Sequence, residues 1–209
     1  MFANLVKSEE ELRDLLGNPG KLAANKTIRL LDEHCRNFIA KSPFLMLATS
    51  DVQGNCDASP RGDAPGFVHV LDERHLVIPE RQGNRKFDSL LNLLTNPKVG
   101  LLFLIPGLGE TLRINGKGFV MRDGDFLEKM SVQGKTPIVG IGIEVEECYI
   151  HCAKALKRSE LWQPASWLSQ DQLPSIPQML AAHIQLPDEV ITPEEVERSL
   201  LESYTKRLY

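Results

Sequence analysis

The segment from residue 78 to residue 86 carries the clearest chemical signal in the chain. It reads Ile-Pro-Glu-Arg-Gln-Gly-Asn-Arg-Lys. The pattern predicts the end of a strand, a polar loop with one glycine, and two cations, Arg85 and Lys86, at the start of a helix. Free backbone amides and the helix dipole attract an anion at such a position, and an arginine guanidinium can hold two phosphate oxygens. The segment suggests a phosphate site, with a solvated basic helix start as the alternative.

A second segment, residues 59–66, reads Ser-Pro-Arg-Gly-Asp-Ala-Pro-Gly. Its two prolines and two glycines predict an irregular, rigid loop between two strands. Loops of this kind often line ligand sites, which makes Arg61 and Asp63 candidate ligand contacts. An ordinary exposed loop explains the same residues.

A basic stripe, formed by Lys154, Lys157 and Arg158, is predicted on a helix late in the chain. Lys154 and Arg158 lie one turn apart and repel each other unless an anion or an acid sits between them. Trp162 follows Arg158 by four residues and could offer a flat stacking surface beside a cation. The alternative is a solvated helix face with a buried tryptophan.

Other catalytic patterns are absent from the sequence. It has no His-Glu-x-x-His, no glycine-rich phosphate loop ending in Gly-Lys, and no Gly-x-Gly-x-x-Gly. Cys148, His151 and Cys152 lie close together, but they lack a fourth ligand for zinc and an orienting group for a nucleophilic Cys–His pair. We therefore expect these three residues to be small polar groups of the core.

Composition limits the classes of protein to consider. With 209 residues, 42% of them hydrophobic and 25% charged, the chain fits one globular domain. A formal net charge of −4 argues against binding to nucleic acid or to an anionic membrane. The longest apolar run, residues 99–105, is too short to cross a bilayer. Four cysteines without Cys-x-x-Cys spacing, and no signal-peptide core, favour reduced thiols and a cytoplasmic location.

The elements that must position these residues are predicted from hydrophobic periodicity and turn signals. Helices are expected at residues 8–16, 28–40, 86–94, 152–161 and 193–207, and strands at residues 44–49, 67–71, 76–78, 99–105, 111–120 and 138–150. In the helix at 86–94, Phe87, Leu90, Leu91 and Leu94 are expected on the inner face. Short strands with few helices between them indicate a closed antiparallel barrel.

Four segments of this sequence resemble the FMN-binding split-barrel proteins related to pyridoxamine 5′-phosphate oxidase. They are Ser-Pro-Phe-Leu-Met-Leu-Ala-Thr-Ser at 42–50, the pair Arg85-Lys86, Asn-Pro-Lys-Val-Gly-Leu-Leu-Phe at 96–103, and Leu-Arg-Ile-Asn-Gly-Lys-Gly at 112–118. Ser-Pro-Arg-Gly-Asp at 59–63 and Lys-Ala-Leu-Lys-Arg-Ser-Glu-Leu-Trp at 154–162 resemble a closer subgroup of the same family.

The resemblance implies a mainly β (α+β) fold. Its core is a six-stranded antiparallel split β-barrel with N- and C-terminal helices. Residues 1–209 would form a single FMN-binding domain, with the barrel at about 42–150 and helical extensions at 1–41 and 151–209.

The resemblance also implies function. The chain would be an FMN-dependent oxidoreductase that transfers hydride or electrons at flavin N5 to or from an unidentified small molecule. It would be a homodimer with FMN at the subunit interface. A flavin carrier or sensor without turnover, and a split barrel that uses F420 or haem, are the alternatives. The oxidase ends in a substrate-binding strand rich in tryptophan and arginine that has no equivalent here, so the substrate stays open.

Site residues follow from the resemblance by position. Arg85 and Lys86 would hold the FMN phosphate, in a loop that also supplies Arg81 and Asn84. Arg61, Gly62 and Asp63 would run along the flavin and its ribityl chain, backed by Ile78 and Pro79. Thr111 falls where the oxidase has a flavin-contacting glutamine, and Arg113 follows on the same face. The other subunit would contribute Lys157, Arg158, Ser159 and Trp162. Candidates for polarising a substrate are Arg61, Arg113 and Lys157.

Overall fold

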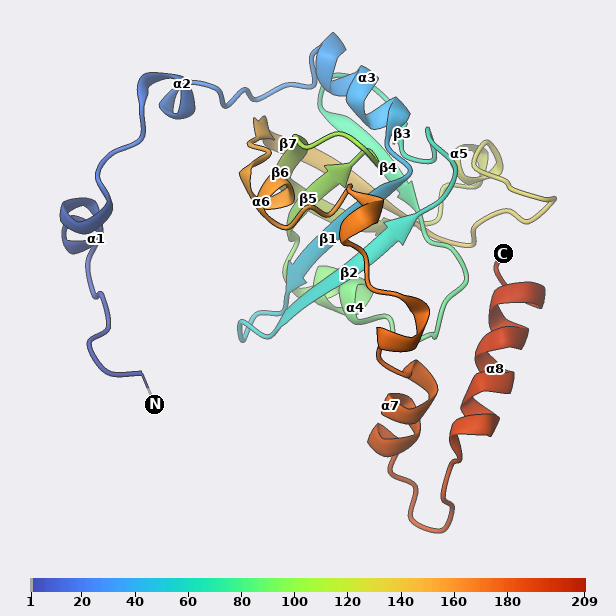
Figure 1. The fold of residues 1–209 in the computed structure, drawn as a ribbon. Coiled ribbons are helices and arrows are strands. Elements are labelled where there is room, and N and C mark those ends of the chain that lie inside the picture. Colours follow the sequence, from blue (N-terminus) through green and yellow to red (C-terminus); the bar gives the residue numbers. More distant parts are fainter. Residues whose placement is uncertain (1) are drawn as a thin grey trace.

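The centre of the molecule is an antiparallel sheet of seven strands (Figure 1). The computed structural model describes residues 2–209, so Met1 of the predicted domain lies outside the described part. The strand order is β2-β1-β5-β6-β7-β4-β3. The strands are β1 (Phe44–Ser50), β2 (Cys56–Gly62), β3 (His69–Val70), β4 (His75–Pro79), β5 (Lys98–Leu104), β6 (Thr111–Met121) and β7 (Gly140–His151).

The predicted count of six strands was wrong, because residues 56–62 form a strand and not a loop. This strand, β2, pairs with β1 along its whole length, from Cys56 opposite Ser50 to Gly62 opposite Phe44. The strand was not predicted because its sequence is polar and because Pro60, near its middle, is unfavourable in a strand. Proline is tolerated there because β2 is an edge strand, where the missing amide breaks no central ladder.

Predicted closure of the barrel is not seen in the backbone pairing. Strands β2 and β3 stand at the two ends of the strand order, and within residues 2–209 no pairing joins them. The molecule is a mostly-β structure built on one antiparallel sheet with helices around it (Figure 1).

One hydrophobic core draws on alternate positions of five strands. Its strand residues include Leu45, Leu47, Leu76, Ile78, Leu101, Phe103, Leu112, Ile114, Ile141 and Ile143, all at most 1% exposed. Helix α3 (Glu33–Lys41) adds Cys35 and Ile39. Because a single cluster collects side chains from all these strands, the sheet curves around it. Burial of each large side chain contributes roughly 1.5–3 kcal/mol to stability.

Strands β6 and β7 form the most extensive pair, and their register shifts between Asn115 and Gly116. A Cβ atom at Gly116 would lie 2.1 Å from the main-chain oxygen of Glu144. The close approach of the two backbones at this bulge therefore requires glycine.

Helix α3 starts later than the predicted residue 28. Its N-cap is Asp32, whose carboxylate accepts a hydrogen bond from the Cys35 amide at 2.8 Å. Ile28 instead pairs with Cys148 in an isolated antiparallel bridge. The helical spacing of apolar residues that predicted a start at residue 28 therefore includes an extended segment before the helix, which pairs with β7.

Helices at both ends of the chain extend away from the sheet (Figure 1). Ser8 caps helix α1 (Glu9–Leu16), because its hydroxyl accepts a hydrogen bond from the Glu11 amide, and the short α2 (Lys21–Ala24) follows. Neither helix contributes a buried residue. Helices α7 (Ile176–His183) and α8 (Pro193–Lys206) pack against each other.

The remaining helices are α4 (Asp88–Thr95), α5 (Gly124–Glu128), α6 (Lys154–Arg158) and the 3-10 turns η1 (Pro164–Ser166) and η2 (Gln170–Gln172). In residues 2–209 no helix is both long enough and apolar enough to span a bilayer. The same residues contain no cluster of three or more potential metal ligands.

Candidate functional site

Two adjoining cavities lie where β2 and β4 end, beside the start of α4. The polar cavity, of about 360 Å³, is lined by residues 59–62, 79–85 and 87–89 together with Phe67. The apolar cavity, of about 730 Å³, is lined by α4, residues 135–139, Val120 and Tyr209. Six residues border both: Glu80, Arg81, Gln82, Gly83, Arg85 and Phe87. The loop between β4 and α4 therefore separates the two cavities.

The polar cavity brings together several residues that the sequence predicted for one site: Arg61, Gly62, Pro79, Arg81, Asn84 and Arg85. Arg61 and Gly62 end β2, Pro79 ends β4, and the loop supplies the rest. Ile78 belongs to the core and is fully buried. Lys86 lies outside the cavity lining and forms an ion pair with Asp88 at 3.3 Å.

Arg61 is held by its neighbours but keeps one donor unused. Its Nη2 donates to Ser89 Oγ at 3.2 Å, and Ser89 Oγ donates to Asp57 Oδ2 at 2.5 Å. Its Nε lies 3.3 Å from Glu80 Oε2. Both of these atoms are buried, and neither has a hydrogen-bond partner in the described part of the chain. Unsatisfied buried polar atoms are rare in proteins and are typical of sites that receive a ligand or an ordered water.

Glu80 is one of two acids that line this cavity, and the other is Asp88. Burial raises the pKa of its carboxyl above the ordinary value, and the charge of Arg61 opposes that shift without cancelling it. Removal from water disfavours the charged form of a carboxylate. The Glu80 carboxylate is therefore easier to protonate than a carboxylate in solvent.

Asp63 and Arg81 form a second buried pair beside the cavity. Arg81 Nε donates to Asp63 Oδ2 at 2.7 Å, and Arg81 Nη1 donates to the Met130 carbonyl at 2.8 Å. Burial alone would raise the pKa of Asp63, but hydrogen bonds from the Ala64 amide and the Tyr209 hydroxyl, together with Arg81, lower it below the ordinary value. The charge of Arg81 is thus neutralised by Asp63, and its guanidinium fixes the loop.

Arg85 is the cation of the loop without an acidic partner: residues 2–209 form no ion pair with it. Its φ of 62° lies in the left-handed region, as does that of Phe87 at 61°. Two such residues in one short segment indicate a backbone held in an unusual shape, which is common at ligand sites. Helix α4 starts after Phe87, so Arg85 and Lys86 precede the helix instead of opening it as predicted.

Of the four side chains predicted for the inner face of α4, only Leu90 packs against the core. Ser89 and Leu93 are its buried residues, whereas Phe87, Leu91 and Leu94 are 49%, 56% and 71% exposed. The left-handed Phe87 ends the helical repeat before Asp88 and thereby changes which side chains face the sheet. The exposed apolar side chains line the apolar cavity instead.

Thr111 and Arg113 line neither cavity. Thr111 is buried at the start of β6, opposite His151 of β7. Arg113 is exposed on β6, with its guanidinium carbon 5.9 Å from the centre of the Tyr149 ring. The structure therefore places these two residues apart from Arg61 and Arg85.

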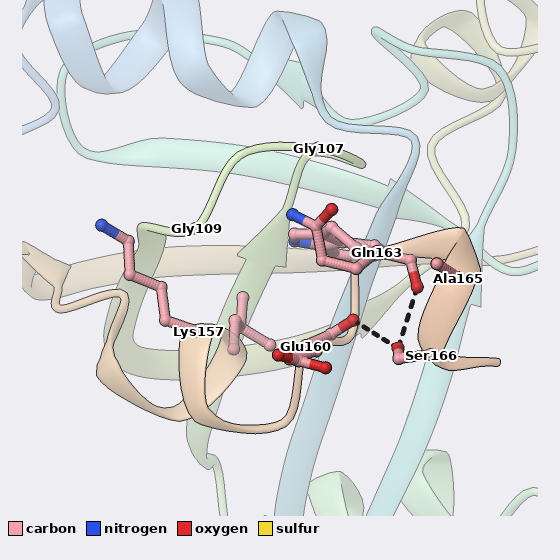
Figure 2. A pocket seen from close by; sticks show the side chains of 9 residues that line it. Gly107, Gly109, Lys157, Glu160, Gln163, Ala165 and Ser166 are labelled. Atoms are coloured by element: carbon pink, nitrogen blue, oxygen red, sulfur yellow. Dashed lines mark hydrogen bonds between the residues drawn. The ribbon is translucent and has the colours of Figure 1, made fainter.

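A third cavity of about 660 Å³ lies between the turn at Gly107 and Gly109 and seven residues of the segment 156–166 (Figure 2). Lys157 and Trp162 line it, while Arg158 and Ser159 do not. The indole of Trp162 donates to the Leu108 carbonyl at 2.9 Å. In Figure 2 the Lys157 ammonium extends away from Gln163 and Ser166. The third cavity shares no lining residue with the first two.

The cysteine cluster divides between core and surface. Cys148 is buried as expected, but His151 and Cys152 are exposed, so the prediction that all three belong to the core was wrong. The sulfur of Cys148 lies 3.8 Å from that of Cys35 and donates to the Leu30 carbonyl at 3.3 Å. All four cysteines are free thiols.

Several residues of the site were not identified from the sequence. Glu80 lay inside the quoted segment, but its pairing with Arg61 depends on the separation of β2 and β4 in space. Asp57 belongs to β2, which was not predicted as a strand, and Ser89 belongs to α4, whose start was predicted too early. Tyr209 reaches Asp63 over 146 residues, and no local pattern signals that contact.

Comparison with known proteins adds a family match. A family model described as pyridoxamine 5′-phosphate oxidase matches residues 31–152. This region contains every residue that lines the polar cavity and ends before residues 156–166 of the third cavity. No curated protein matches the chain.

Solved structures show partial similarity. HupZ from Group A Streptococcus is 17% identical, covering 57% of this chain and 92% of that chain, with a TM-score of 0.46. A candidate pyridoxamine 5′-phosphate oxidase from Lactobacillus delbrueckii is 25% identical, covering 59% and 98% respectively, with a TM-score of 0.46. An FMN-binding protein from Syntrophomonas wolfei is 10% identical, covering 55% and 86%, with a TM-score of 0.42.

Proposed function

Because the chain belongs to the pyridoxamine 5′-phosphate oxidase family, we propose that it binds FMN and acts as an FMN-dependent oxidoreductase on a small molecule. The observation that carries this proposal is the buried Nε of Arg61 at the wall of the polar cavity, which is ion-paired with Glu80 but makes no hydrogen bond in the described part of the chain. A phosphate or a ring carbonyl oxygen of a flavin nucleotide would satisfy that donor. Within residues 2–209, no atom accepts a hydrogen bond from it.

The two cavities match the two halves of a flavin nucleotide. Arg61 and Arg85 supply positive charge at the polar cavity, which suits the phosphate end. The apolar cavity is bordered by Phe87, Leu91 and Ile138, which suits a flat aromatic ring and excludes water from it. Both volumes lie in the range of small-molecule sites or near it.

When bound, FMN supplies hydride or electron transfer at its N5, and the chain's residues bind and orient it. Arg61 and Arg85 would hold the anionic groups, and positive charge beside the ring favours its reduced, anionic form. The Asp63–Arg81 pair keeps the loop between β4 and α4 in place. Such a reaction needs no side-chain nucleophile.

A second copy of the chain completes the proposed site. Lys157, Arg158, Ser159 and Trp162 lie on and beside a cavity that shares no lining residue with the polar one. One chain therefore does not place them against the same ligand as Arg61. In a homodimer with FMN at the interface, the partner copy would supply them.

Cofactor identity in the purified protein tests this function. The expected result is a yellow protein from which FMN is extracted and identified by mass, with riboflavin, F420 and haem as the alternatives that mass distinguishes. Apoprotein is then titrated with FMN while flavin fluorescence is followed. Protein that purifies without flavin and takes up none on titration would contradict the proposal. Bound FMN that neither NADH nor NADPH reduces would favour a carrier or a sensor over an oxidoreductase.

A further inference from the structure

The chain returns to the candidate site at Tyr209, after a long excursion through α6, α7 and α8. Tyr209 lines the apolar cavity, and Figure 1 shows the C-terminal end beside the segment that follows α5. Within α8 only Val196 is buried, so this helix has no broad packing face against the sheet. The contact made by Tyr209 is a local anchor.

Tyr209 joins two segments that are far apart in the sequence, the loop after β2 and the segment after α5. Its hydroxyl donates to Asp63 Oδ1 at 2.8 Å, in the loop after β2. Its main-chain oxygen accepts a hydrogen bond from the Lys135 ammonium, in the segment after α5. The Arg81 guanidinium lies over its ring, 5.9 Å from the ring centre. Three different interactions therefore fix this one residue.

The Asp63 carboxylate depends on that arrangement. Its side chain is only 2% exposed, and it accepts hydrogen bonds from Arg81, the Ala64 amide and the Tyr209 hydroxyl. A buried carboxylate that loses a donor becomes costly to keep charged. Arg81 borders both cavities, so a change in the Asp63–Arg81 pair is transmitted to the junction between them.

We propose that Tyr209 is a positioning residue of the cofactor site. Its hydroxyl holds the Asp63–Arg81 pair at the junction of the two cavities, and its ring closes the apolar cavity against solvent. The inference rests on the proposed binding of FMN, whose ring would lie in the volume that Tyr209 borders. The residue acts through Arg81 and through shielding of the flavin.

The test compares Tyr209→Phe, which keeps the ring, with Tyr209→Ala, which removes both features. Tyr204→Ala in α8 is the matched control, because Tyr204 is 64% exposed. FMN affinity is measured by fluorescence titration of the apoproteins. Iodide quenching of the bound flavin reports how far solvent reaches the ring, and this readout does not respond to a purely structural role of α8.

The alanine variant is expected to bind FMN about tenfold more weakly, the effect of losing one hydrogen bond to a charged group. Its bound flavin should be quenched by iodide at least about twice as efficiently as the wild type's, since the wall of the cavity is gone. The phenylalanine variant should lose affinity but keep the wild-type quenching. Tyr204→Ala should match the wild type in both.

The experiment distinguishes a failure of the role proposed for Tyr209 from a failure of the proposed FMN binding. If the wild-type protein binds FMN and Tyr209→Ala shows unchanged affinity and quenching, the role of Tyr209 is overturned while the proposed function stands. If the wild-type protein binds no FMN, the proposed function itself fails. Hydrogen exchange of the apoproteins at residues 61–64 and 130–136 then shows whether Tyr209 fixes these segments, and unchanged exchange in Tyr209→Ala would overturn the anchoring as well.

Discussion

Arg61 Nε and Glu80 Oε2 lie 3.3 Å apart at the wall of the polar cavity, yet neither atom makes a hydrogen bond within residues 2–209. The two side chains attract each other by charge, but their geometry leaves the directional donor of Arg61 unused. An anionic ligand entering the cavity would gain this donor and would meet the Glu80 carboxylate at the same time. Glu80 therefore opposes the binding that Arg61 favours.

Glu80→Gln should strengthen FMN binding by about threefold to tenfold, because removal of one partly exposed charge changes binding by about 1 kcal/mol. Burial raises the pKa of Glu80, so the wild-type carboxylate takes up its proton as the pH falls and the two proteins should converge in acid. Fluorescence titration over a pH series checks this, with Glu73→Gln on the exposed turn before β4 as the control. Weaker binding by Glu80→Gln at neutral pH would show that Glu80 contacts the ligand favourably.

Arg85→Ala combined with Lys86→Ala should weaken FMN binding by about 1.5–3 kcal/mol, the value of one hydrogen bond between charged groups, because Lys86 pairs with Asp88 outside the cavity lining and only Arg85 faces the ligand. Riboflavin, which lacks the phosphate, should bind the variant and the wild type equally. The two ligands are compared by titration, with Lys7→Ala plus Lys21→Ala on the exposed N-terminal segment as the control for lost charge. Equal losses for both ligands would place the cations away from the phosphate.

Asp63 should make stability depend on pH in the acid range. The pKa of Asp63 is lowered from its ordinary value of 3.8 in the folded protein. Its contribution is therefore fully present above pH 3.8 and is lost as the pH falls through the lowered folded value. Urea unfolding of the wild type and Asp63→Asn at several pH values should give a difference in free energy of unfolding that is constant near neutrality and shrinks in acid. A difference that grows on acidification would contradict this assignment.

Gly116→Ala should destabilise the protein by about 1–3 kcal/mol, the usual cost of forcing an extra atom into a packed region. The new Cβ atom would lie 2.1 Å from the Glu144 carbonyl oxygen, so the β6–β7 pair must shift. Gly124→Ala is the control, since a Cβ atom there meets nothing within 4 Å. Thermal unfolding measures both, and an unchanged Tm for Gly116→Ala would mean that the bulge relaxes freely.

Mixing two inactive variants tests whether two copies build each site. One variant carries Arg85→Ala and Lys86→Ala, and the other carries Lys157→Ala and Trp162→Ala. After unfolding and refolding together in equal amounts, about one site in four should bind FMN with wild-type affinity, because each mixed dimer contains one intact site. Recovery of no tight sites, while each variant alone forms dimers, would place all FMN contacts within one chain.

The strands with dense apolar runs were predictable from the sequence, and β1, β4, β5, β6 and β7 all lie where periodicity indicated. Strand β2 was not, because its alternation is between polar residues of intermediate exposure and exposed ones, with a proline in the middle. Short helices such as α2 and α5 carry too few residues for a period to appear. The intrinsic strand propensity of the residues has little influence where pairing with a neighbouring strand supplies the stabilisation, as it does for β2.

The candidate site was predictable as far as its residues lie in two short segments. Arg61, Asn84 and Arg85 do meet at one cavity. The sequence could not show which of the cations in these segments are neutralised by an acid and which are left to bind a ligand. Asp63 neutralises Arg81, and Lys86 pairs with Asp88, which leaves Arg85 as the cation of the loop without an acid. Such partnerships depend on distances that only the folded chain sets.

Pro60 at the middle of β2 has a consequence for how copies of this chain can meet. An outermost strand normally offers a row of amide donors onto which another polypeptide can add, the first step toward ribbons and fibrils. Proline has no amide hydrogen to donate, so the row is interrupted near its middle and lateral growth of the sheet from this side is disfavoured. Copies of the chain that meet on this side are therefore expected to do so through side-chain contacts and not through added strands.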